Sequence, residues 1–497
     1  MIPPAARPWN GSWRRDEKTQ IIQISRFVVL PTTCCQALNW KPKQRMKRFR
    51  TEFVVRLGMS LNCWQSISGG RFIGRLEPLW FRLAQDTVWV IVLKSVSMGL
   101  IFLQSIFLAR LLGVKEFGLY AFAMSLAGLL SGPATFGFPQ LLVREIAAYK
   151  VKGEWGLAWG LIRFSQRTAF LVSLALMLMV GFGLWIFSDS VSQQVFIASA
   201  LALLTLPPSV LLHLQGSALR GFGSILLGEA VNGVLHSVCF ILFLGGAWLF
   251  MPAYLSASLA LSLQVIGADV SLLIGSLLLS RYASKRVLVS PNEPEQINTI
   301  WMRSALWLVF MALLNLMPQY GGPLVLGAIK GTEEVGLYKI AYQAASFIPF
   351  GFSAVSVVIE PMISQFYAQR DLLRLRRLVI VSTVISVVMA LPFVLLFTIG
   401  GPWFLKVVFG DSYLSSGKAL AVLAVAFVVQ AAIGPTWHAL LMSGYEQILT
   451  KISILVTLTY VLASLLLIPL IGVVGAAVSM LIYFILAAVL VIYFVKC

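Results

Sequence analysis

The chain has 497 residues, of which 59% are hydrophobic and 11% are charged, and its mean hydropathy is +0.88. These values exclude a string of soluble domains and favour a protein that has lipid as its solvent. The net charge of +19 does not indicate nucleic-acid binding, because Lys and Arg lie in short connectors between apolar runs and form no single basic stripe. Five cysteines without a CxxC pair and three histidines predict neither a disulfide framework nor a metal site.

The first 85 residues form a basic arm that carries 15 Lys and Arg residues against four acids. No cleaved signal peptide is expected, because Arg26 interrupts the apolar stretch around it. The stretch from Phe72 to Leu83 is expected either as a short amphipathic helix at the membrane surface or as part of a disordered tail. Met46 and Met59 precede plausible shorter starts, which leaves open whether residues 1–58 belong to the natural product.

Twelve apolar stretches follow, each with the roughly 20 residues that a helix needs to cross about 30 Å of hydrocarbon. Helices are required there, because no water is present to satisfy an open backbone. Prolines and glycines inside several stretches predict kinks. The stretches lie near residues 87–112, 117–142, 167–187, 193–215, 225–250, 254–279, 301–326, 335–363, 376–399, 416–442, 449–470 and 472–494.

The basic residues predict the orientation of these spans. With twelve spans, 31 of the 38 Lys and Arg residues lie on one side of the membrane. The positive-inside rule makes that side cytoplasmic, so both termini are expected in the cytoplasm.

An internal repeat divides the chain into two halves. Residues 113–120 read GVKEFGLY and residues 331–338 read GTEEVGLY, so five of eight positions agree. Because each half contains six spans, the second half enters the membrane in the same sense as the first, which predicts two parallel six-helix repeats around a central cavity. The expected organisation is the arm (1–85), a first bundle (86–280), a cytoplasmic linker (281–300) and a second bundle (301–497).

Several short motifs carry a resemblance to a known family. They are Ala-Arg-Leu-Leu-Gly at 109–113, Phe-Gly-Leu-Tyr at 117–120, Gly-Phe-Pro at 137–139 and Leu-Val-Arg-Glu-Ile at 142–146. With these motifs the chain resembles the Wzx-type polysaccharide flippases of the MATE/MOP superfamily over about residues 85–495. The motifs are more specific for the superfamily than for the substrate.

The resemblance implies a carrier in the bacterial inner membrane that moves an undecaprenyl-diphosphate-linked oligosaccharide to the outer leaflet. Such a carrier serves O-antigen, capsule or exopolysaccharide assembly. Its expected partners are the lipid-linked oligosaccharide, membrane lipids, and a polysaccharide polymerase with glycosyltransferases. No cofactor and no nucleic acid are expected, and a proton or sodium gradient is the expected driving force.

Three residues are candidates for ion coupling, because an ionisable group inside the bilayer needs a partner or a wet cavity. Asp269 is expected near the middle of span six, where a short carboxylate cannot reach the head groups. His236 in span five is its candidate partner, and a histidine satisfied in the core is the alternative. Glu229, near the cytoplasmic face of span five, either pairs with Lys94 of span one or meets water at the mouth.

Cations and amides are the candidates for substrate binding. Lys94, Arg144 and Arg303 are expected to receive the diphosphate, because a dianion entering a low-dielectric cavity needs fixed cations. The alternative for all three is an anchor at the membrane interface. Asn315, Gln319 and Gln343, which offer hydrogen bonds to sugar hydroxyls, serve equally well for contacts between helices.

Two other classes of function remain as alternatives. A MATE-like antiporter of drugs or metabolites would use the same acids, but the excess of intramembrane and inner-mouth cations favours an anionic passenger. A membrane glycan polymerase or ligase needs catalytic groups on its outer face, where the connectors are short and offer neither paired carboxylates nor a nucleophile with a base. The chain is therefore not expected to be an enzyme.

Overall fold

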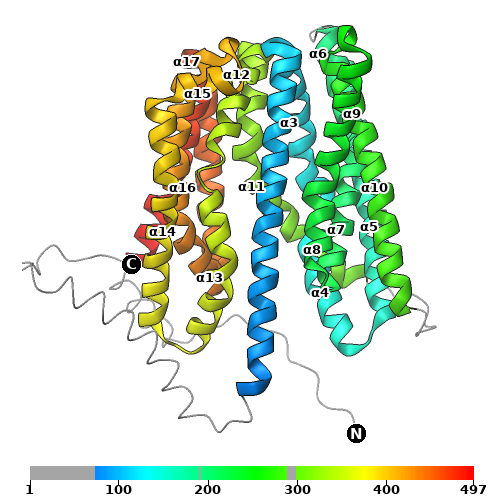
Figure 1. Ribbon diagram of the computed structural model, residues 1–497, viewed down its shortest axis with the longest axis vertical. Helices are drawn as coiled ribbons and strands as arrows, with labels where there is room; N and C mark the ends of the chain where they lie inside the picture. The colour runs from blue at the N-terminus through cyan, green and yellow to red at the C-terminus, as the bar shows by residue number, and fades with distance from the viewer. Residues whose placement is uncertain (1–72, 188, 190–191, 288–297, 497) are drawn as a thin grey trace, which may run out of the picture.

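The computed structural model describes residues 73–187, 189, 192–287 and 298–496, and regular structure in these ranges is helical throughout (Figure 1). The basic arm up to residue 72 and the linker at 288–297 lie outside the described residues. The first half comprises α3 (Ile73–Thr135), α4 (Phe138–Lys152), α5 (Trp155–Ile186), α6 (Gln193–Leu204), α7 (Leu206–Gly221), α8 (Ile225–Glu229), η2 (Ala230–Leu235), α9 (His236–Phe250), η3 (Pro252–Tyr254) and α10 (Ala257–Val287). The second half comprises α11 (Asn298–Lys330), α12 (Thr332–Ala345), α13 (Phe350–Ala368), α14 (Leu372–Ile399), α15 (Gly401–Val408), η4 (Asp411–Ser416), α16 (Gly417–Met442) and α17 (Glu446–Lys496).

The described helices account for twelve spans. Eight continuous helical stretches are long and apolar enough to cross a membrane. Two of them, in α3 and α17, contain a non-helical glycine, Gly113 and Gly472, at which the chain turns back, so each holds two spans (Figure 1). Helix α11 and the pair α12 and α13 supply the remaining two. The prediction of an all-helical membrane protein with about twelve spans is therefore confirmed.

Residues 73–83 form the first turns of α3 and are continuous with the first span. Several helices extend beyond the apolar stretches that predicted them; α5, for example, begins at Trp155 instead of residue 167. The reason is that hydropathy detects only the part of a helix in hydrocarbon, whereas the backbone hydrogen bonds continue into the head-group region.

Two spans are broken in corresponding places of the two halves. The second span breaks at Phe136 and Gly137, which both have positive φ, and α4 then begins with Pro139 in its first turn. The eighth span breaks in a turn at residues 346–349, and α13 follows Pro349. By contrast, Pro435 lies within the unbroken helix α16, so a proline alone does not decide where a span breaks.

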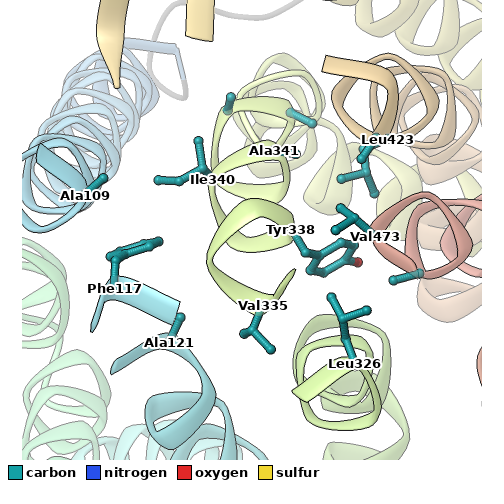
Figure 2. Packing of buried hydrophobic residues seen from close by; sticks show 14 of the residues in the cluster. Ala109, Phe117, Ala121, Leu326, Val335, Tyr338, Ile340, Ala341, Leu423 and Val473 are labelled. Atoms are coloured by element: carbon teal, nitrogen blue, oxygen red, sulfur yellow. The ribbon is translucent and has the colours of Figure 1, made fainter. Parts of the chain in front are cut away.

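Among the described side chains, the largest apolar core shared by the two halves lies toward one end of the molecule. The largest buried cluster joins Phe117 and Ala121 of α3 to Val335 and Ile340 of α12 and continues to α16 and α17 (Figure 2). Toward the other end the core divides into one cluster made only of residues 134–279 and another made only of residues 433–495. We call this divided end the basic end, because the connectors at 150–152, 220 and 370–377 lie there with their Lys and Arg residues.

The repeated GxxExGLY motif forms the crossing of the halves at the end opposite the basic end. Gly118 and Gly336 bring α3 and α12 together so closely that a Cβ atom on Gly118 would lie 1.8 Å from the carbonyl oxygen of Thr332. The glutamate of the motif makes an equivalent hydrogen bond in each half. Glu116 accepts a hydrogen bond of 2.8 Å from the backbone N–H of Ala257, and Glu334 accepts one of 3.0 Å from Val473. Each glutamate thus caps the start of the last span of its own half.

Candidate functional site

Polar contacts reinforce the crossing between the two halves. The guanidinium of Arg110 in α3 donates hydrogen bonds to the carbonyl oxygens of Val407 and Val408, the last two residues of α15. The hydroxyl of Tyr413 donates to the carbonyl oxygen of Ala109 at 3.1 Å. A cation at a helix C-terminus satisfies carbonyl groups that have no partner within the helix. The halves are therefore joined at the end opposite the basic end by close packing and by hydrogen bonds.

A half-buried cation, Lys339, lies on the basic-end side of this crossing. It is the eighth residue of α12, about 10 Å along the helix from its start. Its Nζ atom lies 5.7 Å from the ring centroid of Tyr320 and 5.6 Å from that of Tyr342. In the part of the chain that the structure describes, no hydrogen bond or ion pair joins Lys339 to another residue. Lys339 is therefore a cation inside a membrane span with aromatic neighbours and no acidic partner.

The position of Tyr320 places this cation at the seam between the halves. Tyr320 belongs to α11 of the second half, and its ring lies against Gly128 of α3, where a Cβ atom would come within 2.4 Å of the ring. Gln343 is four residues after Lys339 on α12, so the two side chains share a helix face, and Gln319 directly precedes Tyr320. Both glutamines are half-buried. The seam thus presents a cation, two tyrosine rings and the amide of Gln343.

The energetics of Lys339 favour an anionic ligand. A lysine at the centre of a membrane helix costs about 3 kcal/mol on insertion scales. Contacts with aromatic faces return about 0.5–2 kcal/mol, depending on how far the cation is desolvated. The remaining cost falls further when an anion binds beside the ammonium group, because opposite charges attract strongly where water is scarce.

No ion pair joins Lys94 to Glu229 among the described residues, so the first of the two alternatives for Glu229 is not observed. Glu229 instead accepts a hydrogen bond of 3.0 Å from Arg220 at the end of α7, and both side chains are partly buried. Lys94 is exposed on the first span of α3, which contacts span five through Ser97 and Gly233. The pairing depends on the rotation of each helix about its axis, which hydropathy does not define. A role for Lys94 in binding remains a prediction.

The other predicted cations and Asn315 also lie away from the Lys339 cluster or cannot be assigned to it. Arg144 pairs with its neighbour Glu145 at 2.9 Å, and 67% of the Arg144 side chain is exposed, as for an interface anchor. Arg303 lies in α11, but its side chain is outside the described residues. Asn315 is exposed on the same helix. Of the predicted residues, Gln343 shares a helix face with Lys339, whereas Arg144 is exposed beside Glu145 and Lys94 is exposed on the first span.

His236 and Asp269 do not pair with each other; of the two alternatives for His236, the one observed is a histidine with a neutral hydrogen-bond partner in the core. His236 lies 2.8 Å from the side-chain amide nitrogen of Gln264, whose oxygen accepts a hydrogen bond of 3.2 Å from the hydroxyl of Tyr120. Asp269 is exposed on the face of α10 that also carries the exposed side chains of Ile266 and Leu273. That face lies away from the buried side of α10, which holds Gln264. His236 therefore belongs to a neutral polar network, and Asp269 to an outward face.

One ionisable pair inside the second half was not predicted. Nδ1 of His438 in α16 lies 2.8 Å from Oε1 of Glu360 in α13. An acid inside the apolar run 335–363 was a sufficient signal for Glu360, because such acids need a partner or a wet cavity. No three His, Cys, Asp or Glu side chains gather as metal ligands would in the ranges that the structure covers.

Comparisons with known proteins agree with this architecture. The inward-facing structure of a multidrug resistance MATE family transporter of the MOP superfamily matches with a TM-score of 0.62 at 15% identity, covering 82% of this chain and 97% of that one. The structure of the lipid II flippase MurJ in an inward closed conformation matches with a TM-score of 0.62 at 12% identity, covering 82% of this chain and 88% of the other. At these identities the likeness establishes the fold alone.

Sequence comparisons identify the family. A probable low-salt glycan biosynthesis flippase of Haloferax volcanii is 21% identical over 406 residues, which is 80% of this chain and 80% of that protein. A putative O-antigen transporter of Shigella flexneri is 23% identical over 400 residues, 77% of this chain and 90% of the other. The family model described as "Polysaccharide biosynthesis protein" matches residues 83–367, more than half of the chain. The chain belongs to this family of polysaccharide biosynthesis proteins, and it has the fold of the MATE/MOP superfamily transporters.

Proposed function

We propose that this protein moves an oligosaccharide linked to a polyprenyl diphosphate from the cytoplasmic to the outer leaflet of the cell membrane. The family and the two relatives named as a flippase and as an O-antigen transporter support a lipid-linked glycan as the passenger. The observation on which the proposal depends is Lys339, a cation at the seam between the halves that has no acidic partner among the described residues.

The surroundings of Lys339 suit the head group of such a lipid. The ammonium group attracts the diphosphate, and Tyr320 and Tyr342 offer flat apolar faces to the sugar ring and hydroxyls to its oxygens. Gln343 adds uncharged donors and an acceptor. An antiporter of cationic drugs would place an acid at this position, so the chemistry of the seam favours the flippase over that alternative.

Transport by alternating access is part of the proposal. In this structure the halves share one apolar core at the crossing and have separate cores at the basic end. With the basic end in the cytoplasm, as the positive-inside rule indicates, this arrangement corresponds to a state open toward the cytoplasm. A second state would separate Gly118 from Gly336 and bring the two basic-end clusters together. Polymerases and glycosyltransferases of glycan assembly are the expected functional partners.

Replacing Lys339 tests the proposal directly. The purified protein is placed in liposomes with undecaprenyl diphosphate linked to one N-acetylglucosamine, and both binding and arrival in the opposite leaflet are measured. Loss of one charge-assisted contact in Lys339→Gln is expected to weaken binding by about tenfold or more, whereas Lys339→Arg keeps most of it.

Lys330→Gln is the matched control, because Lys330 is exposed at the end of α11 and away from the tyrosine cluster. Its binding and transport are expected to equal those of the unmodified protein. Unchanged affinity in Lys339→Gln, at equal protein abundance, contradicts the assignment of this site. Failure of the unmodified protein to move the probe contradicts the proposed function.

A further inference from the structure

The pair of Glu360 and His438 joins two helices of the second half inside the membrane. Glu360 lies eight residues before the end of α13, about 12 Å, and His438 lies four residues before the end of α16, about 6 Å. Both ends point to the basic end. The side chains remain partly accessible, His438 by 25% and Glu360 by 36%. The pair is thus within a span, and both side chains are partly exposed although Nδ1 of His438 itself is buried.

The three histidines of the chain have different surroundings. His213 lies on α7, which ends near Arg220, the partner of Glu229. His236 contacts the neutral amide of Gln264. Among the described residues, His438 is the histidine that directly contacts a carboxylate. An imidazole is the side chain that ordinarily changes charge near neutral pH, and here it faces a carboxylate inside a span.

The helices around α13 and α16 carry further charged groups at the basic end. Helix α14 packs on both α13 and α16 and carries Arg374, Arg376 and Arg377 in its first turns, and Arg374 is engaged with Asp371 at 3.1 Å. Helix α17 packs on α16 and carries Glu446 and Lys451 near its start. The first span of α3 carries Lys94. Of these groups, five are cations and two are acids.

Protonation of the pair changes its net charge by one. With one proton the pair is neutral overall, either as imidazolium and carboxylate or as imidazole and carboxylic acid. Without that proton the carboxylate faces a neutral imidazole, and the pair is negative. An uncompensated charge in a low-dielectric environment costs far more free energy than a neutral pair. The neutral, protonated pair therefore favours dry surroundings, and the negative, deprotonated pair favours water or nearby cations.

The contacts of α13 connect this change to the movement of the halves. Beside the pair, the ring of Phe352 lies 5.3 Å from the His438 ring and fills the space over Gly434 of α16. Helix α13 follows the turn at 346–349, whereas α12 before that turn is fixed to the first half at Gly336. The turn therefore separates α12, which belongs to the crossing, from α13, whose packing against α16 involves the pair.

We infer that Glu360 and His438 form a proton-binding site that couples a proton gradient to lipid-linked glycan transport. The coupling acts through the packing of α13 against α16. This inference rests on the proposed transport function. A proton taken up in the outward-open state neutralises the pair and permits return to the present state, and its release to the cytoplasm resets the cycle. The inference replaces Asp269 as the expected coupling residue.

The first test measures the conformation by cysteine labelling, without any lipid substrate. In a cysteine-free background, Val96→Cys on the exposed part of the first span is labelled with a membrane-impermeant maleimide at about pH 6 and pH 8. After correction with a model thiol for the reactivity of the reagent, the labelling rate is expected to change severalfold between the two pH values. Glu360→Gln and His438→Gln are expected to lose this change. Retention of the full pH response in both variants overturns the inference.

The second test reads coupling in liposomes with the lipid-linked N-acetylglucosamine probe. One proton per passenger allows an imposed difference of one pH unit to raise accumulation by up to about tenfold. Both variants are expected to move the probe down its own gradient and to lose the stimulation. Asp411→Asn is the matched control, because it removes an exposed acid of the second half that pairs with Lys406 outside the proposed site.

The outcomes separate the two proposals. Absence of probe transport in the unmodified protein contradicts the proposed function, while the labelling test still decides whether the pair senses pH. Transport with normal stimulation in Glu360→Gln and His438→Gln contradicts the coupling site and leaves the proposed function in place.

Discussion

The crossing of α3 and α12 provides the sharpest prediction about the transport cycle. Gly118→Ala adds one Cβ atom that would lie 1.8 Å from the carbonyl oxygen of Thr332 in the structure. The nearest atoms belong to the backbone of α12, so no flexible side chain can move aside. The two helices must separate by about 1.5 Å to restore an ordinary contact. The substitution therefore acts against the state in which the halves are joined at this crossing.

The size of the effect follows from the cost of overpacking. An extra carbon in a filled contact costs about 1–3 kcal/mol. The penalty applies only to conformations in which the crossing is closed, so it shifts the ratio of closed to open crossings by about 5-fold to 150-fold. Gly336→Ala is expected to act in the same direction, because its Cβ would lie 2.6 Å from the carbonyl oxygen of Val114.

The accessibility of Val96→Cys near the basic end measures this shift. When Val96→Cys is the only substitution, the cysteine is expected to react with the impermeant maleimide from the cytoplasmic side. Adding Gly118→Ala is expected to slow that reaction by severalfold as the basic end closes. Gly181→Ala in α5 is the matched control, since nothing lies within 4 Å of its added Cβ. Equal labelling of Gly118→Ala and the unmodified protein refutes the idea that this crossing must open during transport.

Three further predictions concern residues around the same architecture. Arg110→Ala removes the hydrogen bonds to the end of α15, so it is expected to shift the labelling of Val96→Cys in the direction of Gly118→Ala by only a fewfold; an opposite shift contradicts this role. Glu334→Ala removes the cap of the last span, at a cost of about 1 kcal/mol, and thermal unfolding should rank it below Glu334→Gln, which keeps an acceptor oxygen. Asp269→Asn is expected to leave gradient-driven transport unchanged, because the side chain lies on an outward face; loss of stimulation by a pH gradient returns Asp269 to a coupling role.

The spans and the repeat could be predicted from the sequence because both depend on local patterns. An apolar stretch of about 20 residues has to be a helix in lipid, whatever its neighbours are. The motif around Gly113 and its copy around Gly331 stand out as matching letters, and their matching glutamates then make matching caps in the structure. The breaks at 136–137 and 346–349 lie beside prolines that the sequence had also marked.

The partners of the polar residues could not be predicted in the same way. Glu229 pairs with Arg220 instead of Lys94, and His236 contacts Gln264 instead of Asp269. Each choice depends on how far a helix is rotated about its axis, and a rotation of one residue moves a side chain through about 100°.

By itself, then, the sequence determined the class of protein, the number of spans, the twofold repeat and the side on which the basic connectors gather, because lipid imposes these on any chain of this composition. Only the tertiary structure decided that Lys339 stands among tyrosines without an acid, and that Glu360 meets His438 across 78 positions of sequence. The physical reason is that the free energy and the role of a charged side chain inside the membrane depend on its nearest neighbours. Those neighbours come from other helices, and the hydropathy pattern does not encode how the helices pack.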